Sequence, residues 1–93
     1  MVLYDDRIIK AIKKSKISTK ILRTLHNAFL SLDLTKDYNL FDIREMKGYD
    51  VTYFRLRKGK YRAIFHMDDD NIYVDLIAKR EEVYKLWELL QSD

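Results

Sequence analysis

Apolar and polar residues alternate through residues 51–67, VTYFRLRKGKYRAIFHM, which is typical of strands with one buried face. Gly59 and Lys60 interrupt the alternation and suit the two central positions of a type II′ turn. The pattern therefore predicts a β-hairpin. Its turn sets the register, which pairs Arg57 with Arg62, Arg55 with Ile64, and Tyr53 with His66.

This register gives the hairpin two different faces. Arg57 opposite Arg62 is unfavourable unless an anion lies between the two side chains. A phosphate backbone is one interpretation of that face, and a solvated charged strand face is the more ordinary one for a run of charges. The arginines gather on one face together with an aromatic residue, which favours the phosphate-binding interpretation. The predicted core face carries Phe54, Leu56, Ala63 and Phe65, and the other face carries Tyr53, Arg55, Arg57, Arg62, Ile64 and His66.

Helical periodicity dominates the first third of the chain. Residues 2–4 suit one short strand, and Asp5-Asp6 suits the cap of a following helix. Ser18 is the expected cap of a second helix, whose apolar stripe runs from Ile21 to Leu32. The two segments predict a helical hairpin that packs one face on a sheet. His26 lies off the stripe and is expected to be an exposed helix residue rather than a ligand.

The remaining elements are shorter. Residues 33–42 lack periodicity and predict a loop, residues 43–47 favour the start of a strand, and residues 68–71 form a polar turn rather than a calcium loop. Alternation in residues 72–77 predicts a further strand that pairs Phe65 with Val74, and from Glu81 the pattern becomes helical. In the same register, Ala63 is expected opposite Leu76, Ile64 opposite Asp75, and Arg62 opposite Ile77.

These elements predict one α+β domain over residues 1–93. We expect the N-terminal helical hairpin to pack on a small, mainly antiparallel twisted sheet of three to four strands, with a short C-terminal helix. The chain has no cysteine and two distant histidines, so thiolate chemistry and a metal site are not expected. No apolar run approaches a membrane span and no signal peptide is recognisable, which favours a cytoplasmic protein.

Charge is unevenly distributed, although the formal net charge is only +3. Residues 51–67 carry five cationic side chains and no acidic one, whereas the segment after residue 67 is acidic overall. Lysines and arginines of the first 23 residues are expected on the outer helix faces. Such a pattern suits a polyanion or an acidic protein as partner and does not choose between them.

The segment KGYDVTYFRLRKGKYRAIFHMDDDNIYVDLIAKREEVY resembles the C-terminal half of the RelE/ParE toxin superfamily. The specific parts are Leu56-Arg57, Gly59 and Tyr61-Arg62, followed by Lys79-Arg80 and Val83-Tyr84, in that order and spacing. The predicted helical hairpin also suits the family, so the resemblance covers nearly the whole chain.

The resemblance implies a toxin of a type II toxin–antitoxin system. Its RelE-like branch consists of ribosome-dependent, metal-independent endoribonucleases. They cleave messenger RNA by attack of the ribose 2′-hydroxyl on the adjacent phosphate, which gives a 2′,3′-cyclic phosphate and blocks translation. The implied partners are a RelB-like protein antitoxin, a 70S-type ribosome and mRNA, with no cofactor and no membrane.

Residue by residue, the resemblance implies four catalytic side chains. Arg62 matches the arginine that stabilises the transition state, and Arg80 the arginine that protonates or stabilises the leaving oxygen. Tyr84 matches the tyrosine that stacks on a base, and Arg55 stands where relatives carry a lysine that helps to deprotonate the hydroxyl. The remaining candidates for RNA binding are Tyr53, Arg57, Lys58, Lys60 and Lys79.

Two departures from the family pattern keep alternatives open. A second family lysine is Tyr53 here, and arginine at position 55 is a poor general base because its pKa lies far above neutrality. His66 on the same face is a possible base. The alternatives are a ParE-like, non-enzymatic inhibitor of DNA gyrase and an inactive paralogue that binds only RNA or an antitoxin. Codon preference, cleavage of free RNA, antitoxin identity and oligomeric state are not encoded in any recognisable pattern.

Overall fold

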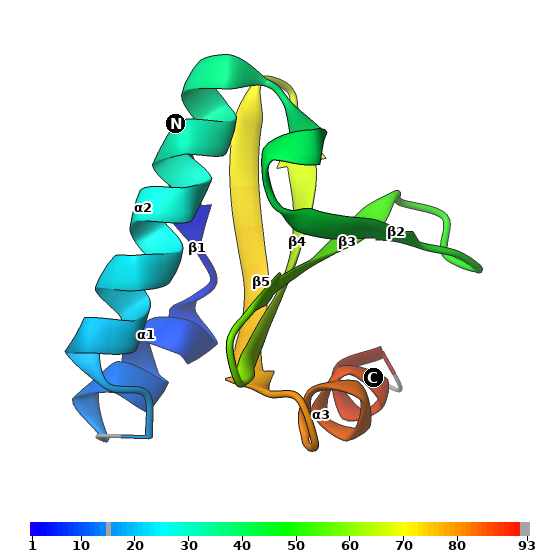
Figure 1. Ribbon diagram of the computed structural model, residues 1–93. Coiled ribbons are helices and arrows are strands. Elements are labelled where there is room, and N and C mark those ends of the chain that lie inside the picture. The colour runs from blue at the N-terminus through cyan, green and yellow to red at the C-terminus, as the bar shows by residue number, and fades with distance from the viewer. Residues whose placement is uncertain (15, 92–93) are drawn as a thin grey trace.

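The computed structural model describes residues 1–14 and 16–91 and has an α+β architecture (Figure 1). Helices α1 and α2 lie against one face of a five-stranded sheet, and α3 lies against the other face at one end. In chain order the elements are β1 (Val2–Tyr4), α1 (Asp6–Lys13), α2 (Thr19–Thr35), the 3-10 helix η1 (Tyr38–Leu40), β2 (Asp42–Met46), β3 (Tyr53–Lys58), β4 (Tyr61–Asp68), β5 (Asn71–Lys79) and α3 (Val83–Gln91).

The strand order is β1-β5-β4-β3-β2. Four strands form an antiparallel meander, and β1 joins it in parallel to β5 with Val2 opposite Ile72. The prediction of three to four strands was therefore too small by at least one. Residues 2–4 and 43–47 were both candidates for strands, but β1 has only three residues and β2 five, too few for the pattern to show that both join the same sheet.

The helices begin at the predicted caps. The side chain of Asp5 accepts a hydrogen bond from the backbone N–H of Arg7, and Ser18 Oγ accepts one from that of Ile21 at 3.2 Å. The two helices are not a matched hairpin, because α1 has eight residues and α2 has seventeen. α2 continues to Thr35, so the predicted loop begins later than expected.

His26 differs from its prediction as an exposed residue. It is half-buried, and a hydrogen bond of 2.8 Å joins its Nδ1 to the hydroxyl of Tyr4. Burial raises the pKa of Tyr4 to about 12, so this hydroxyl stays protonated at neutral pH. The contact joins α2 to β1. The apolar pattern of the helix gave no information on where β1 lies, so this contact was not predicted.

The central hairpin has the predicted register. Arg57 lies opposite Arg62, and the other two predicted pairs are also present. Gly59 has a φ of +58°, whereas Lys60 is not among the residues with positive φ, which agrees with a type II′ turn. Glycine at the first central position is therefore required by the backbone conformation.

The β4–β5 register was predicted correctly only as far as a β-bulge. Phe65 pairs with Val74 as expected, but Ile64 pairs with Leu76, which leaves Asp75 as the extra residue on β5. The predicted pairs of Ala63 with Leu76, Ile64 with Asp75 and Arg62 with Ile77 are therefore wrong by one residue. Their observed partners are Ile77 for Ala63, Leu76 for Ile64 and Ala78 for Arg62.

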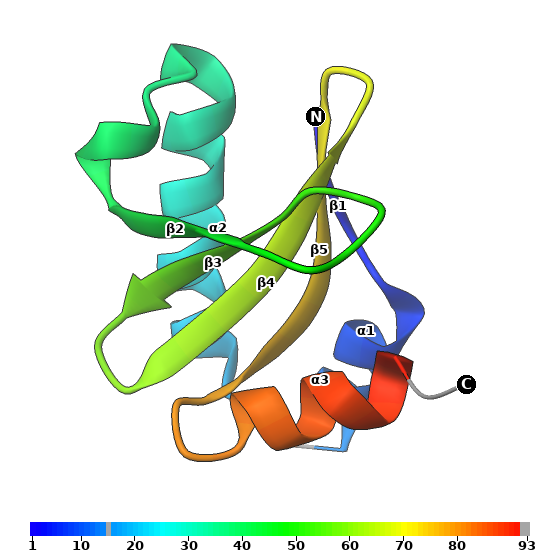
Figure 2. The ribbon, with the colours of Figure 1, turned by 90° about the vertical axis from the view of Figure 1, so that its right-hand side faces the viewer.

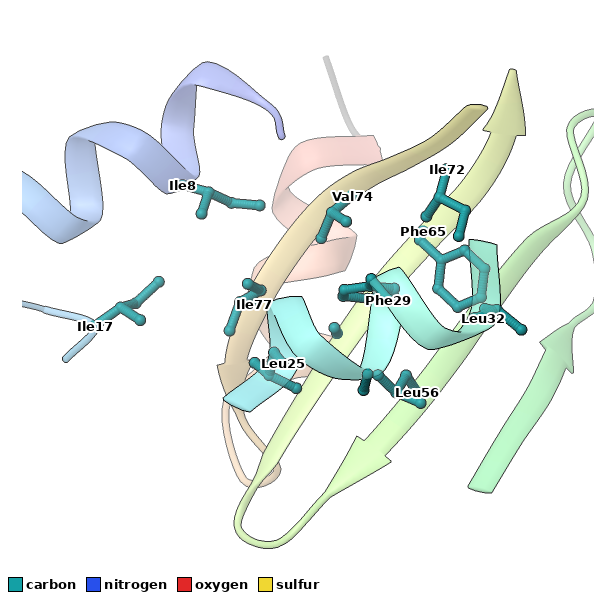
Figure 3. Packing of buried hydrophobic residues seen from close by; sticks show 12 residues of the cluster. Ile8, Ile17, Leu25, Phe29, Leu32, Leu56, Phe65, Ile72, Val74 and Ile77 are labelled. Carbon is teal, nitrogen blue, oxygen red and sulfur yellow. The ribbon is translucent and has the colours of Figure 1, made fainter. Parts of the chain in front are cut away.

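The shift exchanges two apolar side chains between the faces of the sheet. Ile77 belongs to the main core, which also contains Leu25 and in which Phe29 of α2 packs edge-on against Phe65 of β4 (Figure 3). Leu76 instead joins a second, smaller core beneath α3, whose buried members are Ile64, Ala78, Val83 and Trp87. The face with the arginines thus packs against α3, which lies along one end of the sheet in Figure 2.

Candidate functional site

Arg62 is the centre of a cationic cluster at the turn end of the hairpin. Its side chain is buried, with the residue 6% exposed, and its Nη1 donates to the backbone carbonyls of Gly59 at 2.9 Å and Tyr61 at 2.8 Å. These bonds fix the guanidinium in one orientation. Among the described residues, no acceptor binds its Nη2, so this donor is available to a ligand.

Three further guanidinium groups surround Arg62. Burial lowers the pKa of Arg62 from its ordinary value, and the positive charges of Arg57, Arg55 and Arg80 lower it further. The backbone places them close together: Arg57 lies opposite Arg62, and Arg55 stands two residues before Arg57 on the same face of β3. The backbone N–H of Arg80 donates to the carbonyl of Lys60, two residues before Arg62. The sheet face therefore brings Arg55, Arg62 and Arg80 to one patch, although they come from β3, β4 and the segment before α3.

Arg55 connects this patch to α3. Its Nη1 donates a hydrogen bond of 2.5 Å to the hydroxyl of Tyr84, which lies in the first turn of α3 and is 45% exposed. The Nε of Arg55 is buried without a hydrogen-bond partner in the described part of the chain. The phenol ring of Tyr84 thus lies at the edge of the arginine patch, with its hydroxyl bound and much of the residue open to solvent.

β2 adds two charged residues that the sequence analysis missed. Arg44 lies opposite Arg55 and Asp42 lies opposite Arg57, so both stand on the arginine face. The carboxylate of Asp42 is 3.8 Å from Nη1 of Arg57, a distance at which the ion pair is weak because both groups are largely exposed. The alternation of Ile43 and Arg44 was the available signal, but it did not reveal the pairing with β3.

The predicted lysines lie around the hairpin turn. Lys58 and Lys60 are exposed on either side of Gly59, and Lys79 lies opposite Tyr61 at the end of β5. The backbone N–H of Arg80 donates to the carbonyl of Lys60 at 3.0 Å. This bond holds the segment after β5 against the turn, which positions Arg80 beside Arg62.

Tyr53 is part of an aromatic cluster beneath α3. Its ring centroid lies 4.8 Å from that of Trp87 and 5.6 Å from that of Tyr49, both in edge-to-face arrangements. Tyr53 is thus two residues before Arg55 on the same face, but its ring packs against Trp87 of α3. Tyr53 is half-buried in this cluster, so only the part of it that Trp87 leaves open is accessible to RNA.

His66 is paired with Asp75, the extra residue at the β-bulge, and not with a residue of the hairpin turn. Its Nδ1 lies 2.7 Å from Oδ2 of Asp75, and its ring contacts those of Tyr53 and Tyr73. Burial raises the pKa of Asp75, and the bond to His66 opposes this effect. On β4, His66 lies four positions after Arg62, about 13 Å along a strand. His66 and the central arginine therefore do not meet at one phosphate.

Within residues 1–14 and 16–91, no three acidic or histidine side chains converge as the ligands of a metal ion would. In the same part of the chain, none of the helices combines the length and the apolar character that crossing a bilayer demands.

Comparison with known proteins gives a relationship at the level of fold. No protein-family model matches the chain, and no curated protein matches it by sequence. A solved structure does match: a chain of the RelB–RelE antitoxin–toxin complex from Methanococcus jannaschii, with a TM-score of 0.70 and 24% identity. The match covers 90% of this chain and 96% of that one. This chain therefore has the fold of a component of that complex over nearly its whole length.

Proposed function

We propose that this protein is the toxin of a toxin–antitoxin pair and acts as an mRNA endoribonuclease on the ribosome. The observation that carries the proposal is the arginine patch: Arg55, Arg57 and Arg80 surround the buried Arg62, with Tyr84 at its edge. Like charges are brought together at a cost in stability, and a bound phosphodiester offsets that cost. The fold shared with a chain of an antitoxin–toxin complex supports the same assignment.

In the proposed reaction the ribose 2′-oxygen attacks the adjacent phosphorus. The new O2′–P bond forms as the P–O5′ bond breaks, the 2′-hydroxyl loses its proton to water or a ribosomal group, and the leaving 5′-oxygen gains one. The products are a 2′,3′-cyclic phosphate and a 5′-hydroxyl. Extra negative charge develops on the non-bridging oxygens in the transition state, where fixed guanidinium donors are most effective.

The proposal gives each side chain a role that is compatible with its geometry. Arg62 is rigidly held and offers Nη2 to a non-bridging oxygen. Arg80 lies on an exposed segment and stabilises the leaving oxygen, and the ring of Tyr84 stacks on a base. Arg55 acts by its charge and by orienting Tyr84, since a guanidinium is a poor base at neutral pH. Lys58, Lys60, Lys79 and Arg57 hold the flanking phosphates.

Translation of a defined message by purified ribosomes tests this proposal, with cleavage mapped by primer extension. Arg62→Ala should slow cleavage about a hundredfold or more, because one transition-state donor is lost. Arg62→Lys keeps the charge without the planar fork and should recover only part of the rate. Arg23→Ala, an exposed arginine on α2, is the matched control and should cleave as fast as the parent.

The same assay separates the proposal from a protein that only binds. The His66–Asp75 pair lies apart from Arg62, so His66 does not act as the base for a phosphate bound at Arg62. If the ribosome supplies no base either, the protein binds RNA without cleaving it. Cleavage at equal rates by the parent and Arg62→Ala would refute the assigned roles. Inhibition of DNA supercoiling with intact message would instead support the gyrase-inhibitor alternative.

A further inference from the structure

The edge of the sheet is only partly covered along β5. This strand has nine residues, whereas its outer neighbour β1 has three and pairs only with Ile72–Val74. The ladder ends where the N–H of Asp5 donates to the carbonyl of Val74 at 2.9 Å. In Figure 2 the chain then turns away into α1, while β5 continues past it. Within the described residues, no strand pairs with this side of residues 75–79.

A groove follows this unpaired half of β5. It has a volume of about 380 Å³, and five consecutive residues from Asp75 to Lys79 line it. Ile8 and Ala11 of α1 form one wall, and Leu86 of α3 contributes to the other. An unpaired strand between two apolar walls is the arrangement that accepts an added strand, because backbone groups supply hydrogen bonds and the walls accept alternate side chains.

The rim of the groove is cationic. Lys16 and Lys79 line it and are exposed, and Glu82 is the single acidic residue of the lining that is exposed. Arg7 also lines the groove, but its guanidinium is paired with Asp5. The second acidic residue, Asp75, is buried and bonded to His66. The opposite edge strand, β2, differs because Asp42, Arg44 and Glu45 are exposed along it, as is usual for an edge protected against pairing.

From this arrangement we infer that residues 75–79 are a docking edge for an extended segment of a partner protein. The segment adds a strand where β1 ends, places apolar side chains between α1 and α3, and carries acidic residues at its ends that meet Lys16 and Lys79. This surface is separate from the arginine patch, and the inference does not depend on the proposed nuclease activity.

Titration of the full-length, 15N-labelled chain tests the inference by mapping of amide chemical shifts. The probe is a capped peptide with Val-Ile-Val at its centre, flanked on each side by Asp and Glu. We expect the largest shifts in residues 75–79 and α1. A second peptide with the central amides N-methylated keeps charge and side chains but cannot complete the backbone ladder, so it should bind roughly tenfold or more weakly.

Two pairs of variants locate the site. Lys16→Glu should weaken binding of the acidic peptide roughly fivefold, whereas Lys10→Glu on the outside of α1 should have little effect. Ala11→Trp should block the groove, and Leu34→Trp on the 86% exposed position of α2 is its control. Thermal unfolding establishes that Ala11→Trp is folded, and Lys16→Glu remains decisive if it is not.

Three outcomes would overturn the inference. The first is equal affinity of the N-methylated peptide, which would show that no ladder forms. The second is shifts centred on Arg62 instead of β5, which would mean that the acidic peptide only mimics phosphate. The third is the absence of shifts with the probe at millimolar concentration.

Discussion

At the residue scale, the protein holds charges where burial makes them costly. Arg62 is almost completely buried beside three other guanidinium groups, and Asp75 is buried at a bulge. Both groups are fixed by short hydrogen bonds, Arg62 to two backbone carbonyls and Asp75 to His66. Buried charges that are costly but precisely held are typical of functional sites rather than of stabilising ones.

We predict that Asp75→Asn raises the free energy of unfolding at pH 8. The folded pKa of Asp75 is raised, so its ionised form opposes folding at high pH and ceases to do so as the pH falls below its ordinary value of 3.8. Asparagine keeps a hydrogen bond to His66 without the charge. Urea denaturation between pH 4 and pH 8 should show a difference that shrinks toward the acidic end.

Asp5→Asn is the control of opposite sign. The bond to Arg7 lowers the pKa of Asp5, so its contribution to stability is present above 3.8 and is lost as the pH falls through the folded pKa. Asparagine is an equally good helix cap. Equal pH profiles for the two variants would contradict this account of Asp75.

At the element scale, the hairpin and its turn decide where the arginines stand. A slip of β3 by one residue would move Arg55 and Arg57 to the core face and separate them from Arg62 on β4. The tight turn at Gly59 prevents such a slip, and the carbonyl of Gly59 also receives a hydrogen bond from Arg62. The conformation of one glycine is therefore connected to the orientation of the proposed catalytic side chain.

Gly59→Ala should destabilise the fold by about 1 kcal/mol or more, because the turn needs a positive φ there. A Cβ at this position meets no atom within 4 Å, so backbone strain and not collision is the cause. Thermal unfolding measures the effect, with Lys60→Ala as the neighbouring control. A melting temperature unchanged by Gly59→Ala would argue against the type II′ turn.

At the scale of the whole molecule, two cores lie on opposite faces of one sheet. The main core joins α1 and α2 to the sheet, and the smaller core joins α3 to the face that carries the arginines. The smaller core rests on few residues, and the Nε1 of its Trp87 is buried without a hydrogen-bond partner among the described residues. Tyr84 and Trp87 both belong to α3, so the position of Tyr84 at the edge of the arginine patch depends on the packing of this core.

Trp87→Ala should therefore cost about 3 to 5 kcal/mol if α3 folds with the rest of the chain. Leu34→Ala, at an exposed position of α2, should change stability by less than about 0.5 kcal/mol. Chemical denaturation followed by circular dichroism measures both. A loss near zero for Trp87→Ala would mean that α3 is not an integral part of the cooperative unit.

The sequence was sufficient for features that depend on neighbours along the chain. The caps at Asp5 and Ser18, the turn at Gly59 and the pairing of Arg57 with Arg62 follow from local chemistry and period. That register alone predicted one arginine face. Arg80 was a catalytic candidate only through the family resemblance, and the antiparallel pairing of β5 with β4 brings it to the same end of the sheet.

Only the tertiary structure decided the features that depend on distant residues. The bulge at Asp75, the pairing of β1 with β5 and the placement of Arg44 beside Arg55 leave no periodic signal, because each arises from contacts between separate strands. The cover of α3 over Tyr53 and the contact of His26 with Tyr4 are of the same kind. The spacing of apolar residues along the chain determines which face of a helix or strand a side chain lies on. Packing between elements determines which residues that face contacts.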